Sequence, residues 1–163
     1  MARFGIEGIC YFDKLRASGV VSKADDLTYV FNICNGLDRE LRNKGHTRAF
    51  YWANDDCWEI DLRSVTAGGI DDNWADDVDL FFINTHGNNS GGNAILAYNV
   101  KRNEWIGNSS QWRLGNKNLE WLLIYGCHTV DLGNPLSFWH IFQRLHEFCG
   151  AWGICGMESP RMK

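Results

Sequence analysis

The sequence contains no hydrophobic run near the ~20 residues that a membrane-spanning helix needs. Its first ten residues, MARFGIEGIC, lack the basic start, apolar core and cleavage site of a signal peptide. There is also no run of Lys and Arg, and the net charge is −4 with a pI near 5.7, whereas nucleic acid recruits basic surfaces. These absences predict a cytoplasmic protein that binds neither a membrane nor nucleic acid.

Closely spaced cysteine pairs are missing as well. No C-x-x-C occurs, and zinc sites need paired ligands at short spacing, so we expect no metal. The even cysteine count would indicate a disulfide framework in a secreted chain, but in the cytoplasm we expect reduced and mostly buried thiols. The six cysteines are Cys10, Cys34, Cys57, Cys127, Cys149 and Cys155.

Repeats and low-complexity tracts are absent, and only 2 prolines occur among 163 residues. At 45% hydrophobic residues the chain can build a core, so residues 1–163 are expected to form a single domain. Hydrophobic periodicity and glycine or proline boundaries predict the elements. They are strands at 4–12, 47–53, 78–85, 120–126 and 151–157, helices at 24–44 and from Asn134-Pro135 to Gly150, an acidic loop at 68–77, a Gly/Asn-rich loop at 87–93 and a hairpin within 94–112.

Strands 78–85 and 120–126 are apolar nearly throughout, which is typical of strands covered on both faces in a mostly parallel α/β sheet. Each ends beside a glycine: the first in "THG" with His86, the second in "GCHT" with Cys127. If the strands are parallel neighbours, both side chains lie at the sheet edge where such sheets bind ligands. A histidine that takes the proton of a thiol makes it a nucleophile, and the N–H groups of Gly87 and Cys127 can stabilise an oxyanion.

These motifs resemble the caspase-like (clan CD) cysteine peptidases. "THG" is similar to their histidine motif, "GCHT" is similar to the "SCHS" stretch of metacaspases, and the 41-residue spacing is similar too. "VDLFFINTHG" also resembles uncharacterised bacterial members of the superfamily. The resemblance implies a caspase-like three-layer αβα sandwich with a mostly parallel central sheet. It further implies hydrolysis of a peptide or protein substrate by a Cys127–His86 dyad, without a cofactor.

Other features of the sequence bear on substrate binding. Metacaspases carry an Asp two residues before the cysteine, where this chain has Tyr125, so no strong preference for basic residues is expected. Asp131 is a candidate to replace that acid, and Trp105 and Trp112 are candidates to line a substrate cleft, although packing against the sheet is the alternative for both. A homodimer or a partner protein is a candidate to complete the pocket.

Several alternatives stay open from the sequence. His128 is a rival base to His86, although neighbours in an extended segment point to opposite faces. The acidic residues 71–79 are expected to form a solvated loop, with a Ca²⁺ site as the alternative. The rival functions are a catalytically inactive caspase-like binding scaffold and a thiol redox or sensor protein.

Overall fold

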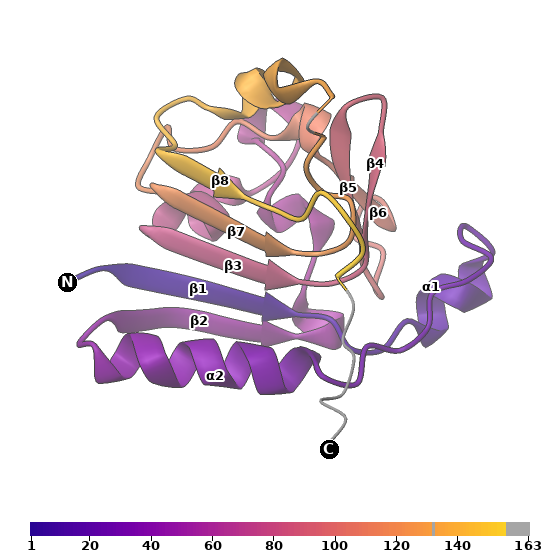
Figure 1. The fold of residues 1–163 in the computed structure, drawn as a ribbon, viewed down its shortest axis with the longest axis horizontal. Coiled ribbons are helices and arrows are strands. Elements are labelled where there is room, and N and C mark those ends of the chain that lie inside the picture. Colours follow the sequence, from indigo (N-terminus) through magenta and orange to yellow (C-terminus); the bar gives the residue numbers. More distant parts are fainter. Residues whose placement is uncertain (132, 156–163) are drawn as a thin grey trace.

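The computed structural model describes residues 1–131 and 133–155. Five strands form one sheet in which every neighbouring pair is parallel (Figure 1). The prediction of a mixed α/β fold with a mostly parallel sheet is therefore confirmed. In their order across the sheet, the strands are β2 (Thr47–Ala53), β1 (Arg3–Gly8), β3 (Leu80–Asn84), β7 (Trp121–Tyr125) and β8 (Glu147–Cys149).

The order of the strands locates a crevice. If the five strands are numbered by their order in the sequence, their order across the sheet is 2-1-3-4-5. This is a doubly wound order, in which the direction of progression reverses between β1 and β3. Ligands of such sheets bind outside the carboxyl ends of the strands at that reversal. The loops after β1, β3 and β7 are thus the expected walls of a site.

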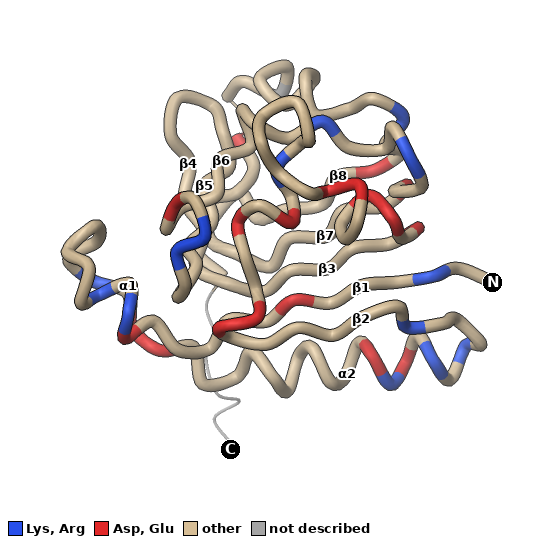
Figure 2. Tube along the Cα trace, turned by 180° about the vertical axis from the view of Figure 1, so that it is seen from behind, with Lys and Arg blue, Asp and Glu red and all other residues tan. Residues whose placement is uncertain are grey.

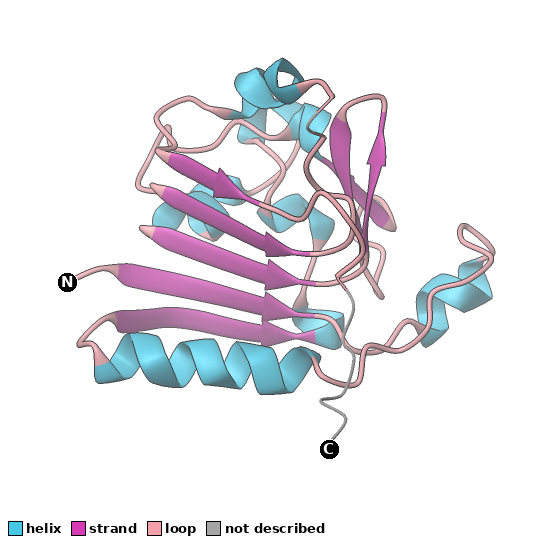
Figure 3. Cartoon of the chain, in the orientation of Figure 1, coloured by secondary structure: helices cyan, strands magenta, loops and turns pink. Residues whose placement is uncertain are grey.

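The two faces of the sheet are covered differently (Figure 3). The long helix α2 (Val30–Asn43) packs on β1 and β2, where Val30 and Cys34 are buried. The other face holds the larger core, which is closed by 3-10 turns and a second sheet. Phe82 points to the α2 side, whereas Phe81 and Ile83 point to the larger core. The described residues contain no helix that is both long and apolar enough to cross a membrane.

The second sheet is antiparallel and follows directly after His86. Its strands are β4 (Gly87–Ser90), β5 (Asn93–Ala97) and β6 (Ile106–Asn108). The predicted hairpin within 94–112 corresponds to β5 and β6. The predicted loop at 87–93 is wrong in its first half, because Gly91 and Gly92, both at positive φ, form a tight turn that lets β4 pair with β5.

The predicted helix at 24–44 begins too early. The sequence repeat is helical from Leu27 onward, yet α2 starts at Val30 and ends at Asn43. Before that point the backbone bonds to the loop after β1: the N–H of Leu27 donates to Cys10 O (2.8 Å). The Asp26 carboxylate accepts the N–H of Phe12 (3.1 Å). Bonds to distant residues therefore replace helical ones. A further short helix, α1 (Asp13–Ser18), follows the loop after β1.

The second predicted helix is also wrong. Pro135 does start a helical segment, but it is a 3-10 helix that ends at Ile141. The chain then pairs with residue 114, where the N–H of Gln143 donates to Leu114 O (2.9 Å), and continues into β8. Residues 147–149, which the apolar pattern assigned to a helix, therefore form β8 and pair with the edge of β7. Of the predicted strand 151–157, residues 151–155 are not a strand, and 156–157 lie outside the described residues.

Candidate active site

The register of β3 and β7 brings His86 and Cys127 to equivalent positions. Asn84 pairs with Tyr125 at the ends of the two strands, and the N–H of Thr85 donates to Tyr125 O (3.2 Å). The paired residues are 41 positions apart in the sequence, and so are His86 and Cys127. Each lies two residues beyond its strand. Parallel strands in this register deliver both side chains to one edge of the sheet.

The two residues share a cavity. Both are half-buried and line a hollow of about 30 Å³ at the carboxyl ends of β3 and β7. The other lining residues are Leu27, Asn84, Thr85, Tyr125, Gly126 and Cys155. The sequence prediction that His86 and Cys127 lie together at the sheet edge agrees with this arrangement.

The glycines beside the two residues have a packing role. A Cβ on Gly87 would lie 2.6 Å from Cys127 O and 2.6 Å from Thr129 Cγ2. A Cβ on Gly126 would lie 3.0 Å from Thr85 O and 3.3 Å from the nitrogen of Gly87. The two turns are therefore in backbone contact, and only glycine permits this approach. The contact fixes how far apart the two loops stand.

The ring of His86 is oriented by groups outside its own strand. Its Nε2 lies 2.7 Å from the backbone oxygen of Asp25, and its face packs on Phe12 with ring centroids 4.7 Å apart. A carbonyl oxygen only accepts, so Nε2 carries the proton of this bond and Nδ1 of the neutral ring is the basic nitrogen. Asp26 anchors the loop that carries Asp25, because its carboxylate accepts a hydrogen bond from Arg16 Nη1 (2.9 Å). This bond is the main cause that lowers the pKa of Asp26.

The C-terminal segment lies against Cys127. The N–H of Cys155 approaches Cys127 Sγ (3.4 Å), and the N–H of His128 donates to Gly153 O (3.0 Å). Burial, then the neighbouring Cys127, raises the pKa of the Cys155 thiol. The ring of His128 is exposed, and its Nδ1 lies 3.2 Å from Trp152 O. His128 does not line the cavity, whereas His86 does.

Two groups of the site gave no clear signal in the sequence. The amide of Asn84 is only 1% exposed, lines the cavity, and its nitrogen has no hydrogen-bond partner among the described residues. Its only sequence signal is a polar residue at the end of an apolar strand. The carbonyl of Asp25 gave none, because every residue carries a backbone oxygen and only the tertiary fold selects one.

Residues 6–161 match a family model described as "Domain of unknown function (DUF6345)". The chain belongs to the DUF6345 family. No curated protein and no solved structure matches it. The family description names no activity, so the function of this DUF6345 chain has to be argued from its own residues.

The predicted substrate residues of the DUF6345 chain separate into two groups. Tyr125 lines the cavity of Cys127 and His86. Trp112 is 1% exposed within the core, so the packing alternative is confirmed for it and its assignment to a cleft wall is wrong. Trp105 is half-buried and packs against the same core, outside the cavity. Asp131 is half-buried, accepts the N–H of Gly133 (2.8 Å), and also lies outside the cavity.

His86 also lines a second hollow. It has a volume of about 230 Å³ and lies between the loop before α2 and the second sheet. His86, Gly87 and Asn88 form one wall, and Lys23 is its charged member. The rest is apolar and consists of Leu15, Val21, Ala24, Ile95, Ala97 and Ile106. An apolar side chain bound here would lie directly beside the imidazole.

The acidic residues of the DUF6345 chain depart from the expected solvated loop. Figure 2 shows red acidic segments beside the amino ends of β3 and β7, and others elsewhere along the chain. Asp71 is 1% exposed and Asp76 is fully buried, while Asp72 is half-buried. The expectation of a solvated loop is wrong for Asp71 and Asp76. Together with Asp72 they form the group of described residues that is able to hold a metal ion.

Proposed function

We propose that the chain is a caspase-like cysteine peptidase that hydrolyses peptide bonds through Cys127 and His86. The observation that supports this most is their equivalent position past the paired ends of β3 and β7, around one cavity. The Asp25 carbonyl adds to it by leaving Nδ1 of His86 free to accept a proton. The fold is proposed as a variant of the caspase-like sandwich, in which 3-10 turns and a small sheet occupy one helical layer.

The reaction would proceed in two halves. His86 Nδ1 takes the thiol proton as Cys127 Sγ attacks the carbonyl carbon of the substrate amide, and the proton passes to the leaving nitrogen as the C–N bond breaks. The remaining thioester joins the acyl group to Cys127. Water then gives a proton to His86 and attacks the thioester, which releases the acid and restores the thiol.

The backbone next to the dyad would stabilise the charge that develops on the carbonyl oxygen. The N–H of Cys127 has no acceptor among the described residues. Ala97 N–H donates to His86 O (3.0 Å), which makes His86 a bonded position of the antiparallel ladder and turns the N–H of the next residue, Gly87, away from β5. Two such N–H groups form the donor set of an oxyanion hole.

The hollow beside His86 supports an apolar substrate residue. Six of its ten lining residues are aliphatic, and its one charged member, Lys23, would repel a basic side chain. Access to Cys127 itself requires that residues 151–155 shift, because the segment is hydrogen-bonded next to the thiol. We therefore propose a peptidase whose resting form is covered by this segment and whose substrate carries an apolar residue near the cleaved bond.

A peptidyl chloromethyl ketone with leucine at its reactive end tests the dyad, because it alkylates a cysteine that lies beside a base. Mass spectrometry of the reduced protein should find the label on Cys127. In His86→Ala the rate of labelling should fall by roughly 100-fold or more, the usual range for a lost general base. His128→Ala is the matched control and should label within about twofold of the parent, since its ring lies outside the cavity.

Equal labelling of the parent and His86→Ala would overturn the dyad and favour the binding scaffold. Circular dichroism of each variant separates loss of folding from loss of base. Hydrolysis of a peptide library is the second readout: cleavage that disappears in Cys127→Ala supports a peptidase. A reactive Cys127 with no cleavage of any peptide would contradict peptide hydrolysis and leave a reactive thiol.

One observation favours a second candidate function, the thiol sensor. Cys127 and Cys155 lie together at the cavity. Hydrogen peroxide would oxidise the two thiols to a disulfide, losing two protons and two electrons while the peroxide is reduced to two waters. Mass spectrometry after peroxide treatment should then show a Cys127–Cys155 link that dithiothreitol reverses and that Cys155→Ser prevents. A sulfinic acid on Cys127 without any such link would contradict the sensor.

A further inference from the structure

Three carboxylates converge far from the dyad, in the 3-10 turns before β3. One oxygen from each of Asp71, Asp72 and Asp76 lies within 4.8 Å of the others. None of the three takes part in an ion pair among residues 1–131 and 133–155, and the nearby cations are used elsewhere. Lys117 donates to Asp72 O (2.7 Å) and pairs with Asp77, while Arg113 Nη1 donates to Trp112 O (2.5 Å).

The three carboxylates differ in how far the protein satisfies them. Asp76 is saturated, because its oxygens accept N–H groups of Gly115, Lys117 and Leu119. Asp71 is satisfied on one side only: Oδ1 accepts the N–H of Val65 (3.0 Å), whereas Oδ2 has no partner among the described residues. Asp71 is only 1% exposed. A buried carboxylate oxygen without a hydrogen-bond partner lowers the stability of the fold.

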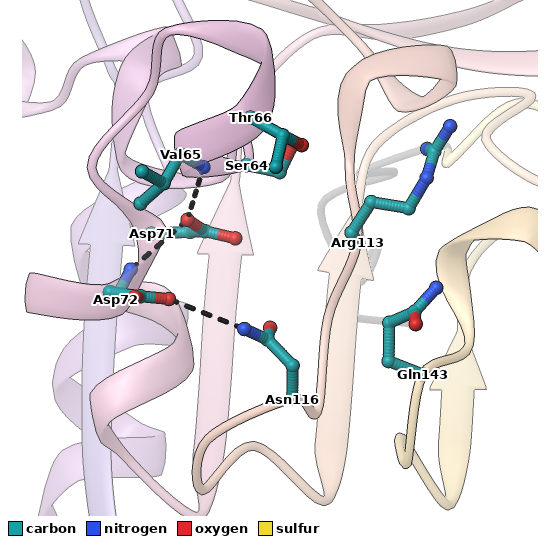
Figure 4. A pocket seen from close by; sticks show the side chains of 8 residues that line it. All are labelled: Ser64, Val65, Thr66, Asp71, Asp72, Arg113, Asn116 and Gln143. Carbon is teal, nitrogen blue, oxygen red and sulfur yellow. Dashed lines mark hydrogen bonds between the residues drawn. The ribbon is translucent and has the colours of Figure 1, made fainter.

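The unpartnered oxygen is itself buried, and it faces the side of a neighbouring pocket that Asp71 lines. Figure 4 shows Asp71 with Oδ1 toward Val65 and its other oxygen toward the space that Asn116 and Arg113 border. The pocket has a volume of about 450 Å³, so it has room for water beside an ion.

Asn116 supplies an oxygen beside those of Asp71 and Asp72. When its amide nitrogen faces Arg113 O (2.9 Å) and Asp76 Oδ2 (2.5 Å), it donates to both. The amide oxygen then occupies the position that the nitrogen otherwise holds, which is about 3.5 Å from Asp72 Oδ1. Two acceptors in such proximity repel one another unless a cation lies between them. Carboxylate and amide oxygens are the hard donors that Ca²⁺ and Mg²⁺ prefer.

We propose that Asp71, Asp72 and Asn116 bind one calcium ion at the amino end of the sheet, while Asp76, whose oxygens are occupied by N–H groups, holds Asn116 in place. Calcium bonds to oxygen at 2.3–2.6 Å, so two of its ligands lie at most about 5 Å apart, which the spacing of the carboxylates satisfies. Calcium also accepts several carboxylates with irregular geometry, whereas magnesium keeps most of its water. The ion would join the loop at 64–76 to the loop at 113–119 and would not touch the dyad.

Calorimetry of EDTA-stripped protein tests the site without any peptidase assay. Titration with CaCl₂ should show one ion per chain, and at a hundredfold excess over Kd the melting temperature should rise by roughly 5–10 °C. MgCl₂ should bind at least tenfold more weakly. Asp71→Asn and Asp72→Asn should each weaken calcium binding tenfold or more, while Asp56→Asn, which alters an exposed carboxylate elsewhere, should leave it unchanged.

Terbium luminescence excited through tryptophan gives a second readout that does not depend on stability. It should appear with the parent and Asp56→Asn, decline as calcium is added, and be absent in Asp71→Asn. Absence of heat, of a thermal shift and of luminescence in the parent would overturn the proposal. Calcium binding of equal strength in Asp71→Asn and the parent, with both folded, would overturn it as well.

Discussion

Replacing Gly87 with alanine tests the backbone contact on which the candidate active site depends. The new Cβ would lie 2.6 Å from both Cys127 O and Thr129 Cγ2, roughly 1 Å inside the 3.5–4.0 Å at which such atoms attract. Two of its three nearest atoms belong to the backbone, so the turns after β3 and β7 have to separate. Overpacking of this kind costs about 1–3 kcal/mol, or roughly 2–12 °C in Tm for a chain of this size.

The same displacement should act on reactivity. A misplacement of about 1 Å in a catalytic arrangement can cost about 100-fold, so alkylation of Cys127 in Gly87→Ala should be slower by a factor of that order. Gly36→Ala is the control, because that glycine lies inside α2 and its Cβ would meet no atom within 4 Å. It should raise the stability by up to about 1 kcal/mol through helix propensity alone. If Gly87→Ala melts within one degree of the parent and reacts equally fast, the two turns are not in contact and the site is wrong.

Three other predictions follow from buried or anchored charges and from the hollow beside His86. Burial, and then the neighbouring Asp61, raises the pKa of Glu7 well above its usual range, and burial raises the pKa of Asp61 to about 6. Stability should therefore fall as pH rises from about 4 through 6, and Glu7→Gln should raise the urea midpoint at pH 8 relative to the parent but not at pH 4. Asp26→Ala should slow alkylation of Cys127 severalfold by loosening the loop that orients His86; an unchanged rate would show that the loop is held by other contacts. A positional-scanning peptide library should favour apolar residues at the cleaved position, and dominance of Arg or Lys that survives Asp131→Asn would contradict the pocket assignment.

The parallel sheet was predictable because its signal is local and repeated. Runs such as 78–85 and 120–126 are apolar on both sides, and the structure has β3 and β7 within them. His86 and Cys127 each lie two residues beyond the paired strand ends Asn84 and Tyr125. This placement also follows from the sequence, once the two strands are assumed to be neighbours in register. When two strands pair in a known register, the separation of two residues in the sequence predicts whether they lie side by side in the fold.

The remaining parts were not predictable for a common reason: their backbone bonds go to distant residues. Leu27 is spaced for a helix, yet its N–H donates to Cys10 O. Phe148 is spaced for a helix too, yet it pairs with Leu122 in the sheet. The burial of Trp112 and the choice of the Asp25 carbonyl as the partner of His86 likewise depend on which segments meet. Periodicity predicts which face is apolar, but it does not predict which partner covers that face.

The two proposed sites use opposite ends of the same strands for physical reasons of their own. At the carboxyl ends the turns after β3 and β7 touch through Gly87 and Gly126, which holds a histidine and a thiol at a fixed spacing. At the amino ends, the loops at 64–76 and 113–119 are hydrogen-bonded to each other. They bury carboxylates that have hydrogen-bond partners for only some of their oxygens. A calcium ion there would tie down the entry of β3, and β3 leads straight to His86. Stability conferred at one end is therefore expected to steady the dyad at the other, although no ligand of the ion contacts it.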